Sequence, residues 1–230
     1  MSAAPPPNAP VPRATLLASF RYATSGILRT LCTQRNMRIH WVSAVAVMLV
    51  GMALDLDLAS RATLVFSVGL VLCMEVLNTA LEAFVDLHVK QYARAAMVAK
   101  DAAAAAVLIL AVGSVVVFAD ILLHRWSMVV RSAEAIERTV ALGVPLLVAV
   151  GLGLSIRRVV PQLVALLAFA IGCLVPLAWA SRDEVFSAGA LAFVVTGFAA
   201  RFLEPRLVPP SETPASAPAL GGPPSERPAG

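Results

Sequence analysis

The sequence predicts an all-α integral membrane protein in which a bundle of helices crosses the lipid bilayer. Of its 230 residues, 59% are hydrophobic and only 14% are charged, and its mean hydropathy is +0.83. This composition is typical of membrane proteins. A transmembrane helix needs about 20 mainly apolar residues. Six stretches meet or approach that length, and we expect each to span the membrane: 39–55, 62–86, 101–119, 140–156, 159–180 and 185–203.

The stretch before the first span predicts a different element. In residues 15–37, apolar side chains are interspersed with Arg21, Arg29 and Arg35. This pattern is typical of a basic amphipathic helix that lies in the membrane interface. Such a helix can anchor the protein and also cover a site. Three tryptophans near span ends, where indole rings prefer the headgroup level, support the boundaries: Trp41, Trp126 and Trp179.

The chain divides into two membrane blocks with a tail at each end. Residues 1–14 and 206–230 are rich in proline and predict disordered tails. Residues 15–120 form the first membrane domain. Residues 121–139 are a polar connector that can hold a short surface helix. Residues 140–205 form an additional three-helix block, whose glycines and prolines favour close packing but indicate no reaction.

The distribution of basic residues predicts the orientation in the membrane. Short cytoplasmic loops carry an excess of Lys and Arg. With the N-terminus inside, thirteen of the 18 basic residues fall on the cytoplasmic side. We therefore expect a multi-pass protein of the cell membrane with both termini cytoplasmic. The polar end of the second span, near Glu82, then faces the compartment that contains ATP.

A polar stripe in the second span is the strongest functional signal in the sequence. Glu75, Asn78, Glu82 and Asp86 follow one another at intervals of 3, 4 and 4 residues, which places them on one face of an α helix. An ionisable side chain at the bilayer centre costs roughly 2.5–3.5 kcal/mol on insertion scales. We therefore expect this face to meet protein, water or a ligand rather than lipid.

A second polar element opens the third span. Lys100 and Asp101 are followed by five alanines, a run with little bulk that lets neighbouring helices approach closely. A lysine at this position can hold a phosphate as a point charge. A short cytoplasmic turn would bring Lys100 to the same aqueous boundary as the polar stripe.

With these two elements the sequence resembles the small prokaryotic lipid kinases, the diacylglycerol kinase and undecaprenol kinase family. The family signature ExxNxxxExxxD is present as Glu75, Asn78, Glu82 and Asp86, and AKDxxxxAV is present as 99–107. The resemblance extends upstream through 33–40 and covers about residues 15–120. The alanine run and the residue sequence of 33–40 look slightly more like the undecaprenol kinase branch. Both lipid alcohols remain open as substrates.

The resemblance implies a homotrimeric membrane kinase of a prokaryotic cell membrane, with an interfacial helix and three spans per subunit. Such a kinase uses ATP with Mg²⁺ to phosphorylate a lipid, and we expect it to bind no nucleic acid. Glu75 resembles the catalytic carboxylate, and Asn78 resembles the polar partner that orders the catalytic centre. Glu82 resembles a ligand of the magnesium that accompanies ATP. The positions that resemble nucleotide contacts are Tyr22, Glu82, Lys100 and Asp101.

These residue types suit phosphoryl transfer on chemical grounds. The reaction depends on positioning and on neutralising negative charge, so a carboxylate-bound Mg²⁺ and a cation near the phosphates are the expected parts. Hard Mg²⁺ prefers oxygen ligands. A carboxylate beside a lipid hydroxyl can accept its proton. Glu75 lies deeper in the predicted span than Glu82, which suits a lipid hydroxyl at Glu75 and metal with ATP at Glu82.

Two positions depart from the family pattern. Gln34 stands where the family has a second metal-coordinating glutamate, and its neutral amide oxygen is a weaker Mg²⁺ ligand than a carboxylate. Thr15 replaces an arginine near the start of the interfacial helix, although Arg13 is close by. The first departure keeps an inactive kinase-like scaffold open as an alternative.

A membrane transporter or ion-translocating protein is the other alternative, since carboxylates within a membrane can serve as proton or cation sites. The second block, 140–203, is nearly free of intramembrane charge and shows no repeat of the first. Both features count against a transporter built from paired halves.

Overall fold

A computed structural model describes residues 15–156, 159–181 and 183–208. Within these ranges the chain forms only helices, with no strand, so the predicted all-α class is confirmed. The eight helices are α1 (Leu16–Thr33), α2 (Arg35–Ala53), α3 (Leu58–His88), α4 (Arg94–His124), α5 (Trp126–Arg131), α6 (Ala133–Ser155), α7 (Val160–Ala180) and α8 (Glu184–Leu207).

The six expected spans correspond to six of these helices. In the described part of the chain, α2, α3, α4, α6, α7 and α8 are long and apolar enough to cross a membrane. With 31 residues, α3 is about 46 Å long. This exceeds the hydrocarbon core of about 30 Å. The last turns of α3, which carry Glu82 and Asp86, can therefore reach the headgroup region.

The expected amphipathic helix over 15–37 is shorter in the structure. Thr15 caps α1 by accepting a hydrogen bond from the backbone N–H of Ala18, while Arg13 lies outside the described residues. The backbone becomes extended at Gln34, with φ −98° and ψ 124°. Arg35 then begins α2, so the last three residues of the expected helix belong to the first span.

The ends of the second block also differ slightly from the expected ranges. The short connector helix is present as α5, but α4 continues to His124 and α6 begins at Ala133. At the C-terminal end α8 continues to Leu207, two residues into the range expected as a tail. The predicted tail at 1–14, and residues 209–230 of the tail predicted at 206–230, lie outside the described residues.

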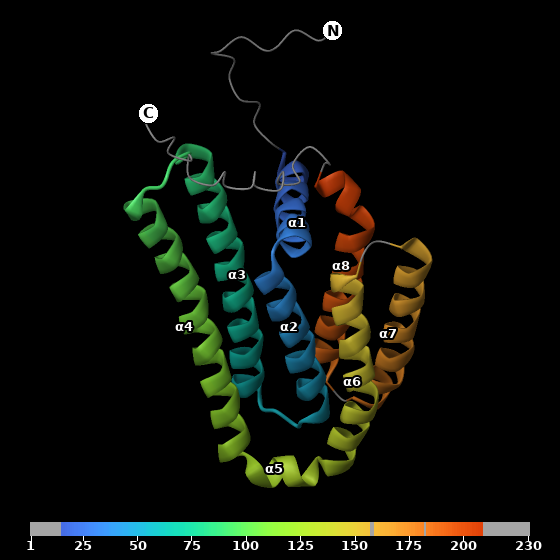
Figure 1. The fold of residues 1–230 in the computed structure, drawn as a ribbon. Coiled ribbons are helices and arrows are strands. Elements are labelled where there is room, and N and C mark those ends of the chain that lie inside the picture. Colours follow the sequence, from blue (N-terminus) through green and yellow to red (C-terminus); the bar gives the residue numbers. More distant parts are fainter. Residues whose placement is uncertain (1–14, 157–158, 182, 209–230) are drawn as a thin grey trace, which may run out of the picture.

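The first span, α2, lies between the α3–α4 hairpin and the second block. Figure 1 shows the α3–α4 hairpin on one side and α6, α7 and α8 on the other, with α1 and α2 between them. Trp41 of α2 is buried, and its indole Nε1 donates a hydrogen bond to the Phe193 carbonyl oxygen of α8 across 2.9 Å. Its ring also meets the Phe193 ring edge to face. The hydrophobic core therefore joins α2 to the second block.

Small residues allow this close contact. A Cβ atom on Gly51 of α2 would lie 2.5 Å from Cδ1 of Phe186, whose side chain is fully buried at the start of α8. A Cβ atom on Gly153 of α6 would lie 2.6 Å from Cε1 of Phe198. Glycine at these points lets two aromatic rings fill the space beside the helix backbones, as interfaces between membrane helices commonly require.

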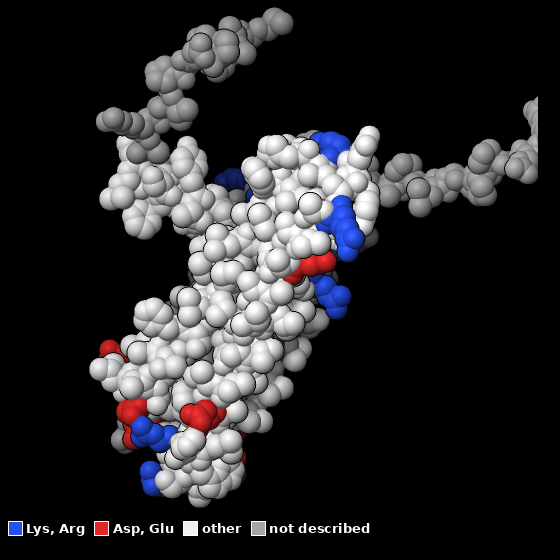
Figure 2. All heavy atoms as spheres, turned by 90° about the vertical axis from the view of Figure 1, so that its left-hand side faces the viewer, with Lys and Arg blue, Asp and Glu red and all other residues white. Residues whose placement is uncertain are grey.

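The α3–α4 side of the bundle is far more exposed. Only 6% of the apolar, membrane-spanning stretch of α4 is buried inside the structure. Figure 2 shows this side as a wide uncharged belt between two ends where charged side chains gather. Such a belt fits a surface that faces lipid or another membrane helix.

Ion pairs hold the end of the bundle opposite α1. Asp57 caps α3 and pairs with Arg125, which follows α4. Arg61 Nε of α3 lies 3.0 Å from Oδ2 of Asp183, and Asp183 also caps α8 through the backbone N–H groups of Val185 and Phe186. These contacts tie the start of α3 to the end of α4 and to the start of α8.

Candidate active site

The polar stripe predicted from the sequence lies on α3 and becomes more exposed toward the end of that helix. Glu75 and Asn78 are buried, with 2% and 7% of their surface exposed. Glu82 is half-buried, and Asp86 is exposed. One face of α3 thus leads from a buried carboxylate to carboxylates that solvent can reach.

Asn78 links the buried and exposed parts of this face. Its Nδ2 group donates a hydrogen bond to Oε1 of Glu82 across 3.1 Å, which orients the Glu82 carboxylate. Its Oδ1 atom is buried and accepts no hydrogen bond from the described residues. A buried amide oxygen without a donor carries a free-energy penalty. Among the described residues, Oδ1 of Asn78 is therefore an acceptor left without a donor.

The α3–α4 hairpin brings the second sequence element to the stripe. Lys100 Nζ lies 2.7 Å from Oδ1 of Asp86, in an ion pair and hydrogen bond across 14 residues of chain. The Lys100 side chain is 34% exposed and the Asp86 side chain 65% exposed. An exposed pair of this kind contributes about 0–1 kcal/mol to stability. The ammonium group is therefore easily diverted to an anion.

A groove between α1 and α3 contains several of the candidate residues. Its volume is about 610 Å³, and Gln34, Glu82 and Asp86 all line it. Ala80 and Ala83 leave room on the α3 side. The break after α1 therefore places the amide of Gln34 in the same groove as two carboxylates.

Three further groove residues were missed by the sequence analysis: Arg29, Thr30 and Thr33 of α1. The hydroxyl of Thr30 donates to the Gly26 carbonyl oxygen, and that of Thr33 donates to the Arg29 carbonyl oxygen. Arg29, Thr30 and Thr33 stand at positions i, i+1 and i+4, which lie on one helix face. The sequence predicts that this helix anchors the protein and can cover a site, but it does not indicate that these three residues line the groove.

Other candidate residues do not line this groove. Glu75 lies two helical turns deeper than Glu82 on α3. Lys100 reaches the groove only through Asp86. Asp101 is exposed on α4. Tyr22 is 62% exposed on α1, and its ring stacks near the Arg21 guanidinium, 5.7 Å from the ring centroid.

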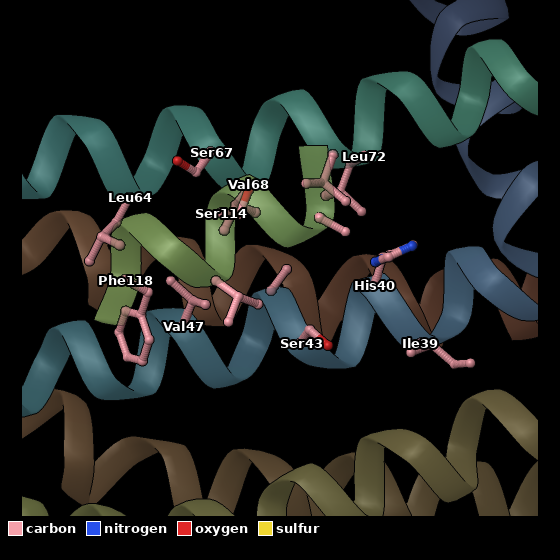
Figure 3. Close-up of a pocket in the computed structure, with 14 residues that line it drawn as sticks. Ile39, His40, Ser43, Val47, Leu64, Ser67, Val68, Leu72, Ser114 and Phe118 are labelled. Carbon is pink, nitrogen blue, oxygen red and sulfur yellow. The ribbon is translucent and has the colours of Figure 1, made fainter. Parts of the chain in front are cut away.

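A separate apolar cavity of about 280 Å³ lies deeper, between α2, α3 and α4. Figure 3 shows side chains from these three helices converging on it, with His40 and Ser43 on α2. Val71 and Leu72 of α3, which precede Glu75 by about one turn, are among its lining residues. Along α3, Glu75 therefore stands between the residues that line the apolar cavity and those that line the groove, and it lines neither itself.

The groove fits a hard divalent cation by its donor types. Glu82 and Asp86 offer carboxylate oxygens and Gln34 offers an amide oxygen, and Mg²⁺ prefers oxygen ligands. Among the described residues no group of three or more His, Cys, Asp or Glu side chains could hold a metal by itself. Mg²⁺ commonly takes one or two carboxylates and completes its shell with water and substrate phosphates.

Comparison with known proteins places the first block in a family. The sequence model described as prokaryotic diacylglycerol kinase matches residues 21–122. The chain is 47% identical over 109 residues to a diacylglycerol kinase of Synechocystis, and this alignment covers 47% of the chain and 62% of that relative. It is also 37% identical over 99 residues to the undecaprenol kinase of Bacillus subtilis, covering 43% of the chain and 80% of that relative.

A third relative, the diacylglycerol kinase of Escherichia coli K12, is 32% identical over 112 residues, which cover 49% of the chain and 89% of that relative. No solved structure matches the chain. The family match covers most of α1 together with α2, α3 and nearly all of α4, and it leaves α5 to α8 outside. Through residues 21–122, which contain the polar stripe and Lys100, the chain belongs to the prokaryotic diacylglycerol kinase family of lipid kinases.

Proposed function

We propose that this protein transfers the γ-phosphate of ATP to the hydroxyl of a membrane lipid, with Mg²⁺, at the cytoplasmic face of the membrane. The observation that carries the proposal is the arrangement on α3. Along this helix, the buried Glu75 stands between Val71 and Leu72, which line an apolar cavity, and the groove formed with Gln34, Glu82 and Asp86.

The lipid would approach from the membrane side. The cavity near Val71 and Leu72 suits an acyl or isoprenoid chain, because its lining is mainly apolar. The lipid hydroxyl would then lie near Glu75, whose carboxylate would accept the hydroxyl proton. Diacylglycerol and undecaprenol both have such a hydroxyl, and the relatives include kinases named for each.

ATP would bind from the groove side. Glu82, held by Asn78, would ligate the metal together with Gln34 or Asp86. A bound Mg²⁺ would neutralise the negative charge that develops on the phosphates during transfer. Lys100 would leave Asp86 and donate to a phosphate oxygen. Tyr22 and Asp101 would contact the nucleotide as α1 and the start of α4 approach it.

Orientation and assembly belong to the same proposal. The groove must open to the cytoplasm because ATP is available there, which agrees with the bias of Lys and Arg toward that side. The exposed apolar side of α3 and α4 offers a surface for assembly into the homotrimer expected from the family resemblance.

The test is phosphate transfer by the purified full-length protein. Incubated with radiolabelled ATP, Mg²⁺ and either lipid, the protein should yield labelled lipid phosphate. Glu75→Gln should lower kcat by about 10²–10⁴-fold, the usual contribution of a general base. Glu184→Gln, in the first turn of α8, is the matched control and should retain activity.

Failure of the wild-type protein to label either lipid, when it is folded and nucleotide is present, would reject the kinase proposal. Full activity of the Glu75→Gln variant would instead reject the role given to that carboxylate.

A further inference from the structure

A second groove lies between α2 and α6, where the family-matched block meets the additional block. Its volume is about 700 Å³. It shares no lining residue with the groove between α1 and α3. The lining residues are Arg35, Arg38, Ile39, Val42, Ser43, Val148, Gly151, Leu152, Leu154 and Ser155.

One end of this groove is cationic. Arg35 and Arg38 stand in the first turn of α2, opposite the last turn of α6. Arg38 Nη1 donates a hydrogen bond to the Leu154 carbonyl oxygen across 3.2 Å, which fixes its guanidinium at the groove. A guanidinium has five N–H donors, so Arg38 keeps donors for a ligand. None of the described residues that line the groove is acidic.

The rest of the groove is apolar. From the arginines it continues toward the middle of both helices along Ile39 and Val42 of α2 and Val148 and Leu152 of α6. Ile39, Val148 and Leu152 are each about half exposed. A Cβ atom on Gly151 would meet no atom within 4 Å, so this glycine leaves open space rather than contacting a neighbouring helix. The groove therefore has a cationic end and an apolar length.

We propose that this groove binds an anionic phospholipid of the surrounding membrane, with the phosphate at Arg35 and Arg38 and an acyl chain along α2 and α6. Arginine pairs well with phosphate because its planar donors form two hydrogen bonds at once. Basic pockets between transmembrane helices bind anionic headgroups in this way. A zwitterionic lipid would add a cationic group beside the two arginines, which the groove has no carboxylate to balance.

The proposal does not rest on the kinase reaction, although the groove shares Ile39 and Ser43 with the apolar cavity between α2, α3 and α4. One wall is α6, which lies outside residues 21–122, so the site is not carried over from the family match. The binding groove exists only because α6 packs against α2. Its arginine end lies next to Gln34, at the same end of the bundle as the candidate active site.

The first experiment fills the groove. The purified full-length protein in detergent is titrated with phosphatidylglycerol or phosphatidylcholine, and bound lipid is counted by native mass spectrometry. The wild-type protein should retain phosphatidylglycerol at lower lipid concentration than phosphatidylcholine. Gly151→Leu should abolish this preference. Gly172→Leu makes the same change on α7, also in open space, and should preserve it.

The second experiment removes charge without filling space. Arg35→Gln changes an exposed side chain and should weaken phosphatidylglycerol binding by about tenfold, the loss expected for one charge-assisted contact. Arg94→Gln at the exposed start of α4 is the matched control and should bind as the wild type does.

Two results would overturn the proposal. One is equal retention of the two lipids by the wild-type protein. The other is an unchanged preference in Arg35→Gln, which decides the question even if Gly151→Leu fails to fold.

Discussion

Arg38 of α2 donates a hydrogen bond from Nη1 to the carbonyl oxygen of Leu154 across 3.2 Å, so the first span caps the C-terminal end of α6. Arg201 of α8 makes a second such contact, from Nη2 to the Ile156 carbonyl oxygen. The last carbonyl groups of a helix have no partner within the helix, and cations are favoured there. Two arginines therefore join α2, α6 and α8 at one end of the bundle.

Replacing Arg38 tests this junction. Arg38→Met keeps much of the side-chain length but removes every donor, so the Leu154 carbonyl oxygen loses its partner. We expect a loss of about 1.5–3 kcal/mol of stability, the range for hydrogen bonds to charged groups. Thermal unfolding of the full-length protein in detergent measures it, and Arg94→Met serves as the control. Equal melting temperatures for the two variants would contradict the capping role.

The close contact between α2 and α8 gives a packing prediction. Gly51→Val should be destabilising by about 1–3 kcal/mol, because its Cβ would overlap the fully buried Phe186 ring. Gly69→Val on α3 adds the same atoms in open space and is the matched control. Both variants can be compared by thermal unfolding. If Gly51→Val melts no lower than the control, the two helices are not held as closely as described.

Gln34 gives a prediction about the metal. Gln34→Glu would add a third carboxylate to the groove that contains Glu82 and Asp86. We expect the Mg²⁺ concentration for half-maximal lipid phosphorylation to fall by about tenfold, equivalent to roughly 1.4 kcal/mol, since ligand charge strengthens binding of hard cations. Thr33→Ser, beside it in the groove, controls for local change. An unchanged Mg²⁺ requirement would mean that another group already supplies this ligand.

The pair of Lys100 and Asp86 gives a prediction about ATP. Lys100→Gln should raise the KM for ATP by about tenfold or more, as expected for loss of a charged hydrogen bond to phosphate. Stability should change by less than about 1 kcal/mol because the pair is exposed. Lys90→Gln is the control, since Lys90 contacts only the Asp86 backbone oxygen in the described hydrogen bonds. A stability loss without a change in KM would make Lys100 a structural residue.

Asp57 gives a prediction about pH. Hydrogen bonds from Ser60, together with Arg125, lower its pKa from 3.8 to about 2. A depressed pKa in the folded state contributes stability above the unfolded pKa, and this contribution is lost as the pH falls from about 4 through 2. Ser60→Ala should move this loss of stability to higher pH. Melting temperatures measured between pH 5 and pH 2 would show the shift. Identical profiles for Ser60→Ala and the wild-type protein would contradict it.

The candidate site shows both the strength and the limit of prediction from sequence. The spacing of Glu75, Asn78 and Glu82 is a local property of one helix, and the structure places all three on one face of α3. Thr30 belongs to the groove only because α1 packs beside α3. Hydropathy and charge describe α1 as an amphipathic helix but do not say which helix its polar face meets.

Trp41 shows the same limit for packing. Its place near a span end predicts a ring at the headgroup level, and Trp126 and Trp179 are indeed exposed, at 62% and 92%. Trp41 is instead 5% exposed and contacts Phe193 of α8. Proximity to a span end is a one-dimensional signal, whereas burial depends on which helix lies beside it.

The apolar spans, the polar stripe on α3 and the pairing of that stripe with the Lys100 element can all be predicted from the amino-acid sequence. These features depend on helix periodicity and on the cost of placing polar groups in lipid. The folded structure was needed to show that α2 shares its core with α6 and α8, and that two arginines meet an apolar groove there. The reason is that partner choice depends on the fit of particular faces, such as Gly51 against Phe186.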